Sequence, residues 1–346
     1  SRKQIKSMGQ PAQYAVGAAV QAIDSARLSR DVLREEGTGV IVGNDSCALP
    51  VVEAVDAVRE HHQTRHIGSG NIIQVMSSTV TMNLSTYFGI RGASWTVSGA
   101  CASGAHAIGQ AYLLIKSGLQ ETVLCGGAQE INWQGMASFD ALGAFARDGG
   151  EPARASRPFD RDRTGLVPSG GSAMLVLERL DRAIERDAPI YAELVGYAFS
   201  SDGDHLTQPR GDGAVRAMRQ ALRQAKVSPG EVEYINAHAT ATPVGDRIEG
   251  LSILDVFGRN GPPVSSTKSM TGHECWMAGA SELVYSMLMM RDGFLAPNIN
   301  LEALEPELEG LAVVRETQMR RPRVVLSNSF GFGGTNAALL LKAFER

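Results

Sequence analysis

Cys101 is the residue of this chain whose surroundings suggest chemistry most directly. It lies in the small-residue segment 97–105, between a short β-like run at 94–97 and a helix predicted over 106–116. At such a strand-to-helix turn, the helix N-terminal amides favour thiolate over thiol, which suits a nucleophile. The small neighbours would let a carbonyl group approach, and the Cys101 amide could donate to a developing oxyanion. A lone cysteine in an apolar segment is more often structural, so its partners must decide its role.

Two histidines are the candidate partners of this cysteine. His238 follows a buried strand predicted at 234–236, and His273 ends the segment 266–273, which is rich in hydroxyl-bearing residues. One such histidine on its own is more often a structural residue. Two of them, together with a candidate nucleophile and Lys268, favour a catalytic site.

Two further patterns resemble known ligand sites only superficially. His61, His62 and His66 lie close together, but no cysteine or acidic ligand accompanies them, so we expect a solvated helix end or loop. The glycine-rich turn at 331–334 lacks the full G-x-G-x-x-G spacing and a following βαβ unit, which argues against dinucleotide binding. Its glycines suit close approach to a substrate, with the Phe332 amide completing an oxyanion hole.

An alternation of strands and helices must position these residues. Strands are predicted at 40–43, 94–97, 121–127, 173–178, 191–196, 234–236, 324–327 and 338–342. Helices are predicted at 11–26, 50–60, 72–88, 106–116, 213–225, 246–257 and 281–291. This alternation predicts an α/β architecture whose sheets are covered on both faces.

The chain also divides into two halves around a polar, arginine-rich connection at 146–165. We place the first half at 1–170 and the second at 171–346. A strand followed by a small-residue turn occurs at Cys101 and again near Phe332, which suggests a duplicated fold.

Composition excludes several classes of function. The 346 residues carry a formal net charge of −4 and no long basic run, which argues against nucleic-acid binding. Four cysteines without metal-ligand spacing or disulfide density fit a reducing cytosol. No apolar run reaches the roughly 20 residues of a membrane span, and no signal peptide opens the sequence. We therefore expect a soluble, cytoplasmic protein.

Four segments, at 97–105, 236–246, 266–282 and 327–336, together resemble the β-ketoacyl-[acyl-carrier-protein] synthases of the elongating types I and II, in the thiolase superfamily. The resemblance covers essentially the whole chain and keeps the motifs in family order. It implies a five-layered αβαβα fold with two similar halves, and a homodimer or a heterodimer with a related subunit. It also implies acyl and malonyl substrates carried on the phosphopantetheine arm of acyl carrier protein, with no bound cofactor and no metal.

The resemblance implies a role for each matching catalytic residue. Cys101 would attack an acyl thioester and hold the acyl group. Neutral His238 and His273 would then donate hydrogen bonds to the thioester oxygen of a malonyl group as it loses carbon dioxide. The resulting carbanion would attack the acyl-enzyme, whose oxyanion the amides of Cys101 and Phe332 would hold. Lys268 would orient the histidine region, with Glu282 in support. The product would be a 3-oxoacyl group in fatty-acid or related polyene or polyketide-like elongation.

Other positions match parts of the family that bind substrate or carrier protein. Phe332 resembles the gate between acyl pocket and entrance. Thr240 and Thr242 match positions that hold the pantetheine arm. Residues expected near the acyl pocket are Gly135, Met136 and Phe139. Cations expected to dock the acidic carrier protein are Arg2, Lys3 and Lys6, although three exposed cations are usually just a solvated face.

The sequence departs from the family pattern in three places. It begins at the expected docking helix, without the family's opening strand, which would leave a sheet edge to be covered. Ala239 replaces a glycine beside His238, so a positive φ there would be costly. Trp276 and Met277 replace small residues after His273, from which we expect a reshaped acyl pocket or partner surface and specialised substrates.

Two other functions stay open. A chain-length-factor-like partner subunit without catalytic activity would typically lack the nucleophile, so Cys101 and both histidines argue against it. A thiolase-like acyltransferase using coenzyme A would tend to carry a second cysteine as base in place of the histidine pair.

Overall fold

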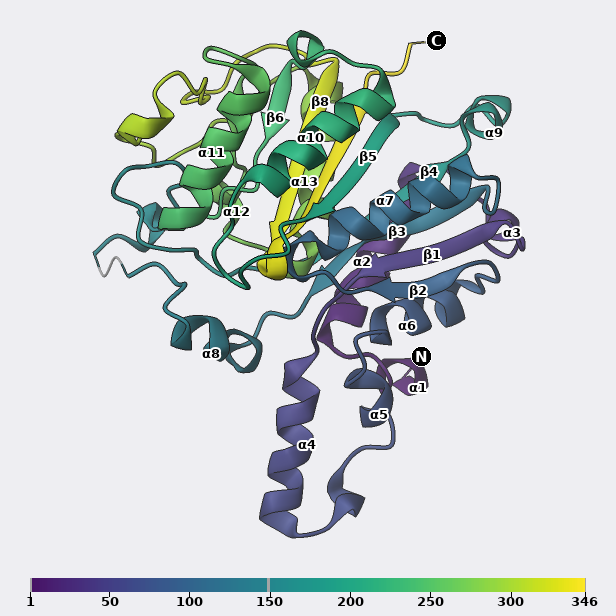
Figure 1. The fold of residues 1–346 in the computed structure, drawn as a ribbon. Coiled ribbons are helices and arrows are strands. Elements are labelled where there is room, and N and C mark those ends of the chain that lie inside the picture. Colours follow the sequence, from purple (N-terminus) through teal and green to yellow (C-terminus); the bar gives the residue numbers. More distant parts are fainter. Residues whose placement is uncertain (1, 148–149, 346) are drawn as a thin grey trace.

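Two β-sheets with the same internal order form the framework of the protein (Figure 1). The structure is a computed structural model that describes residues 2–147 and 150–345. The first sheet has the order β2-β1-β3-β4, with strands β1 (Thr38–Gly43), β2 (Ser94–Val97), β3 (Thr122–Gln129) and β4 (Gly171–Glu178). The second has the order β5-β9-β8-β6-β7, with strands β5 (Glu193–Ser201), β6 (Tyr234–Asn236), β7 (Val264–Ser265), β8 (Val324–Gly331) and β9 (Thr335–Lys342).

Strand directions in the two sheets match one for one. The β1 strand runs parallel to β2 and β3, and β4 is antiparallel to β3. In the same way β6 runs parallel to β7 and β8, and β9 is antiparallel to β8. The second sheet continues to β5, antiparallel to β9, whereas β4 has no further strand beside it among the described residues. The fold is therefore duplicated, as the sequence suggested.

Helices cover both faces of each sheet and complete five layers. One outer layer holds α2 (Gln10–Ser25) and α6 (Thr79–Phe88), and the other holds α10 (Asp212–Ala225) and α11 (Pro243–Phe257). Between the sheets lie α7 (Ser103–Lys116) and α13 (Ala278–Asp292), which contact strands of both. The protein thus has the αβαβα arrangement of the thiolase fold.

Short apolar side chains let the central layer pack closely. Helix α7 buries Ala105, Ala107, Ile108 and Ala111 at helical spacing, and these join a core that includes Tyr197 of β5 and Leu283 of α13. On the outer face, α2 buries Ala15, Ala19 and Ile23, with Pro11 in its first turn. This close packing brings the N-terminal end of each central helix near the end of the strand that precedes it.

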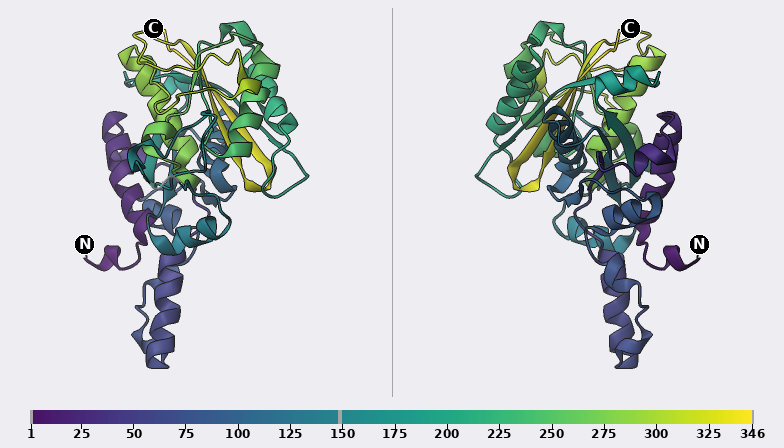
Figure 2. Two further views of the ribbon diagram at one scale, coloured as in Figure 1. Left: turned by 90° about the vertical axis from the view of Figure 1, so that its left-hand side faces the viewer. Right: turned by 90° about the vertical axis from the view of Figure 1, so that its right-hand side faces the viewer.

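The remaining helices are short or peripheral. They are α1 (Arg2–Ile5), α3 (Arg30–Leu33), α4 (Ala48–His61), α5 (Asn71–Gln74), α8 (Trp133–Ala141), α9 (Leu180–Glu185) and α12 (Lys268–Thr271). Helix α4 projects from the body as an arm, and only Pro50 of it is buried (Figure 2). His61, His62 and His66 are exposed near its far end, in agreement with the solvated helix end expected. No described helix has the length and apolar character needed to cross a membrane.

Three expectations about the fold were wrong. The helix predicted at 72–88 is two helices, α5 and α6, because the Asn44 side chain donates to the Ser77 carbonyl at 2.7 Å and competes with helical bonding there. The strand at 173–178 pairs with β3, so the first half ends after β4 rather than at residue 170. Cys101 and Phe332 do not occupy equivalent turns, since Cys101 follows β2, the counterpart of β7, whereas Phe332 follows β8.

Candidate active site

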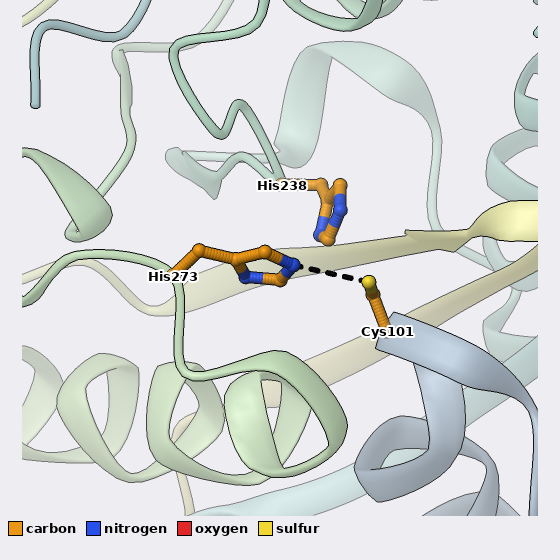
Figure 3. Close-up of side chains that lie close together, drawn as sticks. All are labelled: Cys101, His238 and His273. Atoms are coloured by element: carbon orange, nitrogen blue, oxygen red, sulfur yellow. Dashed lines mark hydrogen bonds between the residues drawn. The ribbon is translucent and has the colours of Figure 1, made fainter. Parts of the chain in front are cut away.

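The structure brings Cys101, His238 and His273 together from three separate segments, with Cys101 just before α7, His238 after β6 and His273 after α12 (Figure 3). His273 Nε2 lies 3.0 Å from Cys101 Sγ, and the rings of the two histidines meet edge to face with centroids 5.4 Å apart. One potential ligand atom from each residue lies within 4.8 Å of the others. All three side chains are buried, so reactants that reach them are shielded from water. A thiol and two imidazoles could also hold a thiophilic cation.

The turn that carries Cys101 is held in a strained shape. Ala100 has φ +46°, a left-handed conformation that costs about 1 kcal/mol or more for a residue with a side chain. Its amide donates to Asp45 Oδ2 at 3.0 Å, and its carbonyl accepts from Ser103 Oγ at 2.6 Å. A Cβ on Gly43 would lie 2.3 Å from the Ser103 backbone, so β1 and α7 meet in direct contact. These contacts fix the direction in which Cys101 points.

Burial raises the pKa of the Cys101 thiol to about 12, although the charge of Lys268 acts in the opposite direction. The helix amides, expected to favour a thiolate, are therefore outweighed by the loss of hydration at this buried sulfur. A protonated thiol needs a base before it can attack. His273 Nε2 is in hydrogen-bond distance of the sulfur to receive that proton.

Both histidines are kept neutral by their surroundings. Burial lowers the pKa of His238 and of His273 well below the usual value, and the nearby charge of Lys268 lowers each further. Lys268 Nζ lies 3.5 Å from His238 Nδ1, which directs a proton to the other ring nitrogen. His273 Nδ1 has no hydrogen-bond partner among the described residues. His273 is thus free to carry its proton on either nitrogen.

Lys268 itself is paired with Glu282 in a buried salt bridge, in which the carboxyl is charged only once the pH approaches its pKa. Burial raises the pKa of Glu282 to about 8, and Lys268 opposes that rise. The Glu282 carbonyl also accepts from Asn236 Nδ2 at 3.1 Å, next to the strand end that leads to His238. The pair therefore supports the segment that carries His238.

Two acids of α11 hold the loop that carries His238, a role that was not predicted from the sequence. Glu249 accepts from the His238 amide at 2.9 Å, and burial raises its pKa to about 7. Asp246 accepts from the amides of Phe159 at 2.8 Å and Ala241 at 3.2 Å. The left-handed residue of this loop is Ala241, at φ +68°, so the strain expected at Ala239 falls two residues later. The only signal for these acids was their spacing three residues apart on one helix.

A cavity of about 390 Å³ opens beside the three reactive side chains. Its polar lining includes Thr240 and Thr242, whose hydroxyl oxygens are 3.1 Å apart, as well as Asp202, Gln208 and Asn336. Apolar groups such as Phe139 and Leu166 line another part. A long substrate with a polar arm and an apolar group can therefore lie across Cys101.

Comparison with known proteins identifies the family. The model described as "Beta-ketoacyl synthase, N-terminal domain" matches residues 1–183, and "Beta-ketoacyl synthase, C-terminal domain" matches 191–302. The chain belongs to the β-ketoacyl synthase family. It is 43% identical to 3-oxoacyl-[acyl-carrier-protein] synthase 1 of Haemophilus influenzae, over 99% of this chain and 85% of that protein.

Solved structures agree with this assignment. A β-ketoacyl synthase from Burkholderia phymatum STM815 superimposes with a TM-score of 0.95 at 36% identity, covering 100% of this chain and 85% of that one. A ketosynthase in complex with its type II polyketide acyl carrier protein, AntDE:AntF, superimposes with a TM-score of 0.92 at 29% identity, covering 97% and 85%.

Phe332 of this synthase lies where the cavity meets Cys101. Its side chain is 40% exposed, and its ring stacks on that of Phe139 with centroids 6.0 Å apart. The following residue, Gly333, has φ +80° and donates its amide to the Leu206 carbonyl at 2.7 Å. The turn thus presents one aromatic ring to the cavity and anchors itself on the loop opposite.

The residues expected near the acyl pocket separate into two groups. Met136 and Phe139 pack in one apolar cluster with Cys101, Cys275 and Trp276, which we call the thiol cluster. Gly135 lies in the first turn of α8, where its amide donates to Asn132 Oδ1 at 2.8 Å, and it does not line the cavity. The apolar groups packed around Cys101 thus come from α8 and from the segment after His273, and only Phe139 of the three expected residues also lines the cavity.

The cations expected to dock carrier protein lie at the other end of the first half. Lys6 is exposed and follows α1. Arg2 and Lys3 belong to α1, but their side chains lie outside the described part of the structure. Docking by these residues stays a prediction.

Proposed function

We propose that this synthase uses Cys101, His238 and His273 to condense an acyl group with a malonyl unit, both carried on acyl carrier protein. The protein is an acyltransferase of the 3-oxoacyl-[acyl-carrier-protein] synthase type. The observation that carries the assignment of residues is the meeting of one thiol and two neutral imidazoles at a buried point of a cavity.

Acyl transfer comes first. The Cys101 sulfur attacks the thioester carbonyl while its proton passes to His273 Nε2. The amides of Cys101 and Phe332 stabilise the oxyanion. As the tetrahedral intermediate collapses, the new sulfur–carbon bond remains, the carbon–sulfur bond to pantetheine breaks, and the departing thiolate takes the proton back from His273. The enzyme then holds the acyl group with both histidines neutral.

Condensation follows when a malonyl thioester occupies the site. The carbon–carbon bond to the carboxylate breaks, carbon dioxide leaves, and the electron pair moves toward the thioester oxygen. His238 and His273 donate hydrogen bonds to that oxygen. The carbanion attacks the acyl-enzyme carbonyl and expels the Cys101 thiolate, which regains a proton from water. The two histidines must be neutral donors for this step, and their lowered pKa values agree with that.

The rest of the site supplies substrate binding. Thr240 and Thr242 hold the pantetheine arm from the polar side of the cavity. Arg2, Lys3 and Lys6 contribute to a docking surface for the acidic carrier protein. We also propose that the protein works in the cytoplasm as a homodimer or with a related subunit. The four free, buried cysteines suit a reducing compartment.

A condensation assay tests this proposal. Purified protein, an acyl carrier protein charged with an acyl group, and malonyl carrier protein should yield a 3-oxoacyl product two carbons longer. Replacing carrier protein by coenzyme A thioesters should lower the rate sharply; a preference for coenzyme A would favour a thiolase-like enzyme. Absence of product from every donor would favour a partner subunit without catalytic activity.

A further inference from the structure

Trp276 occupies the apolar side of the nucleophile. It lies in the 3₁₀ turn Cys275–Met277, three residues after His273, and its side chain is only 9% exposed. It belongs to the thiol cluster, and its ring centroid is 6.0 Å from that of Phe139. An acyl chain attached to Cys101 must find apolar surroundings, and this cluster provides them around the sulfur. The indole does not line the cavity itself, but it fills apolar space beside Phe139 and the sulfur that an acyl chain would otherwise be able to enter.

The position of the indole is fixed from two directions. Its Nε1 donates to Ser46 Oγ at 3.2 Å, which ties the ring to the segment after β1. Its backbone carbonyl lies 3.1 Å from the place of a Cβ on Gly104 and 3.2 Å from that of a Cβ on Gly127. The backbone of Trp276 therefore packs directly against α7 and β3. The backbone cannot shift without disrupting those contacts, and the ring cannot rotate without losing its hydrogen bond to Ser46.

We propose that Trp276 sets the acyl chain length by closing the apolar space beyond Cys101. This inference rests on the proposed function and assigns its substrate class, namely acyl groups shorter than the same site would take with a small residue at this position. In an apolar pocket, one methylene that does not fit costs about 10-fold to 200-fold in specificity. A rigid indole in contact with the acyl chain is therefore sufficient to set a sharp upper limit.

Met277, the neighbouring large residue, lies on the other side of the turn. It is 4% exposed, and its Cα is 2.6 Å from the place of a Cβ on Gly127. Its sulfur lies 3.8 Å from the corresponding place on Gly171 in β4, and it is not part of the thiol cluster. Met277 fills the gap between this turn and the first sheet. Met277 is therefore the matched control. Of the two large residues expected to reshape the acyl pocket, Trp276 is the one that remains a candidate.

The test compares Trp276→Phe, Trp276→Leu and Trp276→Ala with Met277→Ala and the wild type. Each protein is mixed with acyl carrier proteins that bear a series of even-numbered straight chains, and acylation of Cys101 is followed by intact mass. We expect the ratio of acylation rates, longer chain over shorter, to rise in the order Phe, Leu, Ala. The rise should reach at least about tenfold in Trp276→Leu, whereas Met277→Ala should stay within about twofold of the wild type.

Thermal unfolding of each variant shows which proteins are folded and therefore comparable. If Trp276→Ala fails to fold, the Phe and Leu variants decide the question. A folded, acylated Trp276→Leu protein with the wild-type ratio overturns this inference alone. Absence of acylation of the wild type by every chain overturns the proposed function, and this inference with it. A shift as large in Met277→Ala also overturns the assignment to Trp276.

Discussion

The two sheets share one topology but place different chemistry at equivalent strand ends. The end of β1 leads to Asp45, and the end of its counterpart β6 leads to His238. After β2 comes Cys101, and after β7 come Lys268 and His273. A duplicated scaffold thus brings equivalent turns to one point. Divergence of the turns places the thiol on one half and the two imidazoles on the other, as the proposed mechanism requires.

The halves also differ in electrostatics. Around Cys101 the first half places the apolar Met136 and Phe139 and the acid Asp45. The second half buries the Lys268–Glu282 pair and the acids Glu249 and Asp246 near the histidines. One low-dielectric site therefore keeps the thiol protonated and both imidazoles neutral. In the proposed mechanism the first half supplies the nucleophile, whereas the second half supplies the base for acyl transfer and the hydrogen-bond donors for decarboxylation. The predictions below test that division.

The largest expected effect separates the two chemical steps. Cys101→Ala should lower acyl transfer by at least about 10⁴-fold, because the nucleophile is gone, while carbon dioxide release from malonyl carrier protein stays within about tenfold. His273→Ala should lower carbon dioxide release by about 10²-fold to 10³-fold, since one donor to the thioester oxygen is lost. Release of labelled carbon dioxide measures this step. Equal loss of both steps in Cys101→Ala would contradict the division of labour.

The buried ion pair should make the next largest contribution. Lys268→Met leaves Glu282 without its partner and should lower the free energy of unfolding by about 3 kcal/mol. Chemical denaturation measures this. Arg216→Met, which removes the exposed pair with Asp212, is the control and should change stability by less than about 0.5 kcal/mol. Similar values for the two variants would show that the Lys268 pair is not a structural support.

Stability should also depend on pH through Glu282. Its folded-state pKa of about 8 lies above the ordinary value of 4.5, so in this range the folded protein keeps a proton that the unfolded chain releases, and stability falls as pH rises. The histidines oppose this only below about pH 6.5. Glu249, whose pKa is about 7, adds to this fall at lower pH. Between about pH 7 and 8 we therefore expect Glu282 to account for a loss of about 1 kcal/mol in denaturant unfolding. Glu282→Gln should weaken the dependence of the unfolding free energy on pH. If that dependence is unchanged, other titrating groups cause it.

The smallest expected effect concerns the strained turns of the two halves. Ala100 at φ +46° and Ala241 at φ +68° both adopt conformations that glycine adopts more readily. Ala100→Gly should raise the free energy of unfolding by up to about 1 kcal/mol. Ala241→Gly should raise it less, because the Ala241 methyl is fully buried and its removal loses packing. A loss of stability in Ala100→Gly would contradict the strain inferred at the nucleophile turn.

The sequence predicted the parts of the molecule that local patterns determine. Most strands and helices lie within a few residues of the prediction, and Cys101, His238 and His273 were singled out from the small and hydroxyl-bearing residues around them. The structure brings these three together, and it places Thr240 and Thr242 on the same cavity.

What the sequence could not predict depends on distant contacts. Asp45 and Glu249 are ordinary acids in the sequence, and only folding places one on the Ala100 amide and the other on the His238 amide. The thiolate expected at Cys101 failed for the same reason, because burial is a tertiary property that outweighs the local helix terminus. Local patterns also could not predict that β4 pairs with β3.

The central claim is that the first half supplies the nucleophile, Cys101, and that the second half activates it. Intact mass of the wild type after mixing with acyl carrier protein thioesters, followed by peptide mapping, tests it most directly. We expect a single added acyl group on Cys101, no addition in Cys101→Ala, and slower addition in His273→Ala because the base is lost. An acyl group on any other residue, or one retained by Cys101→Ala, would contradict the account.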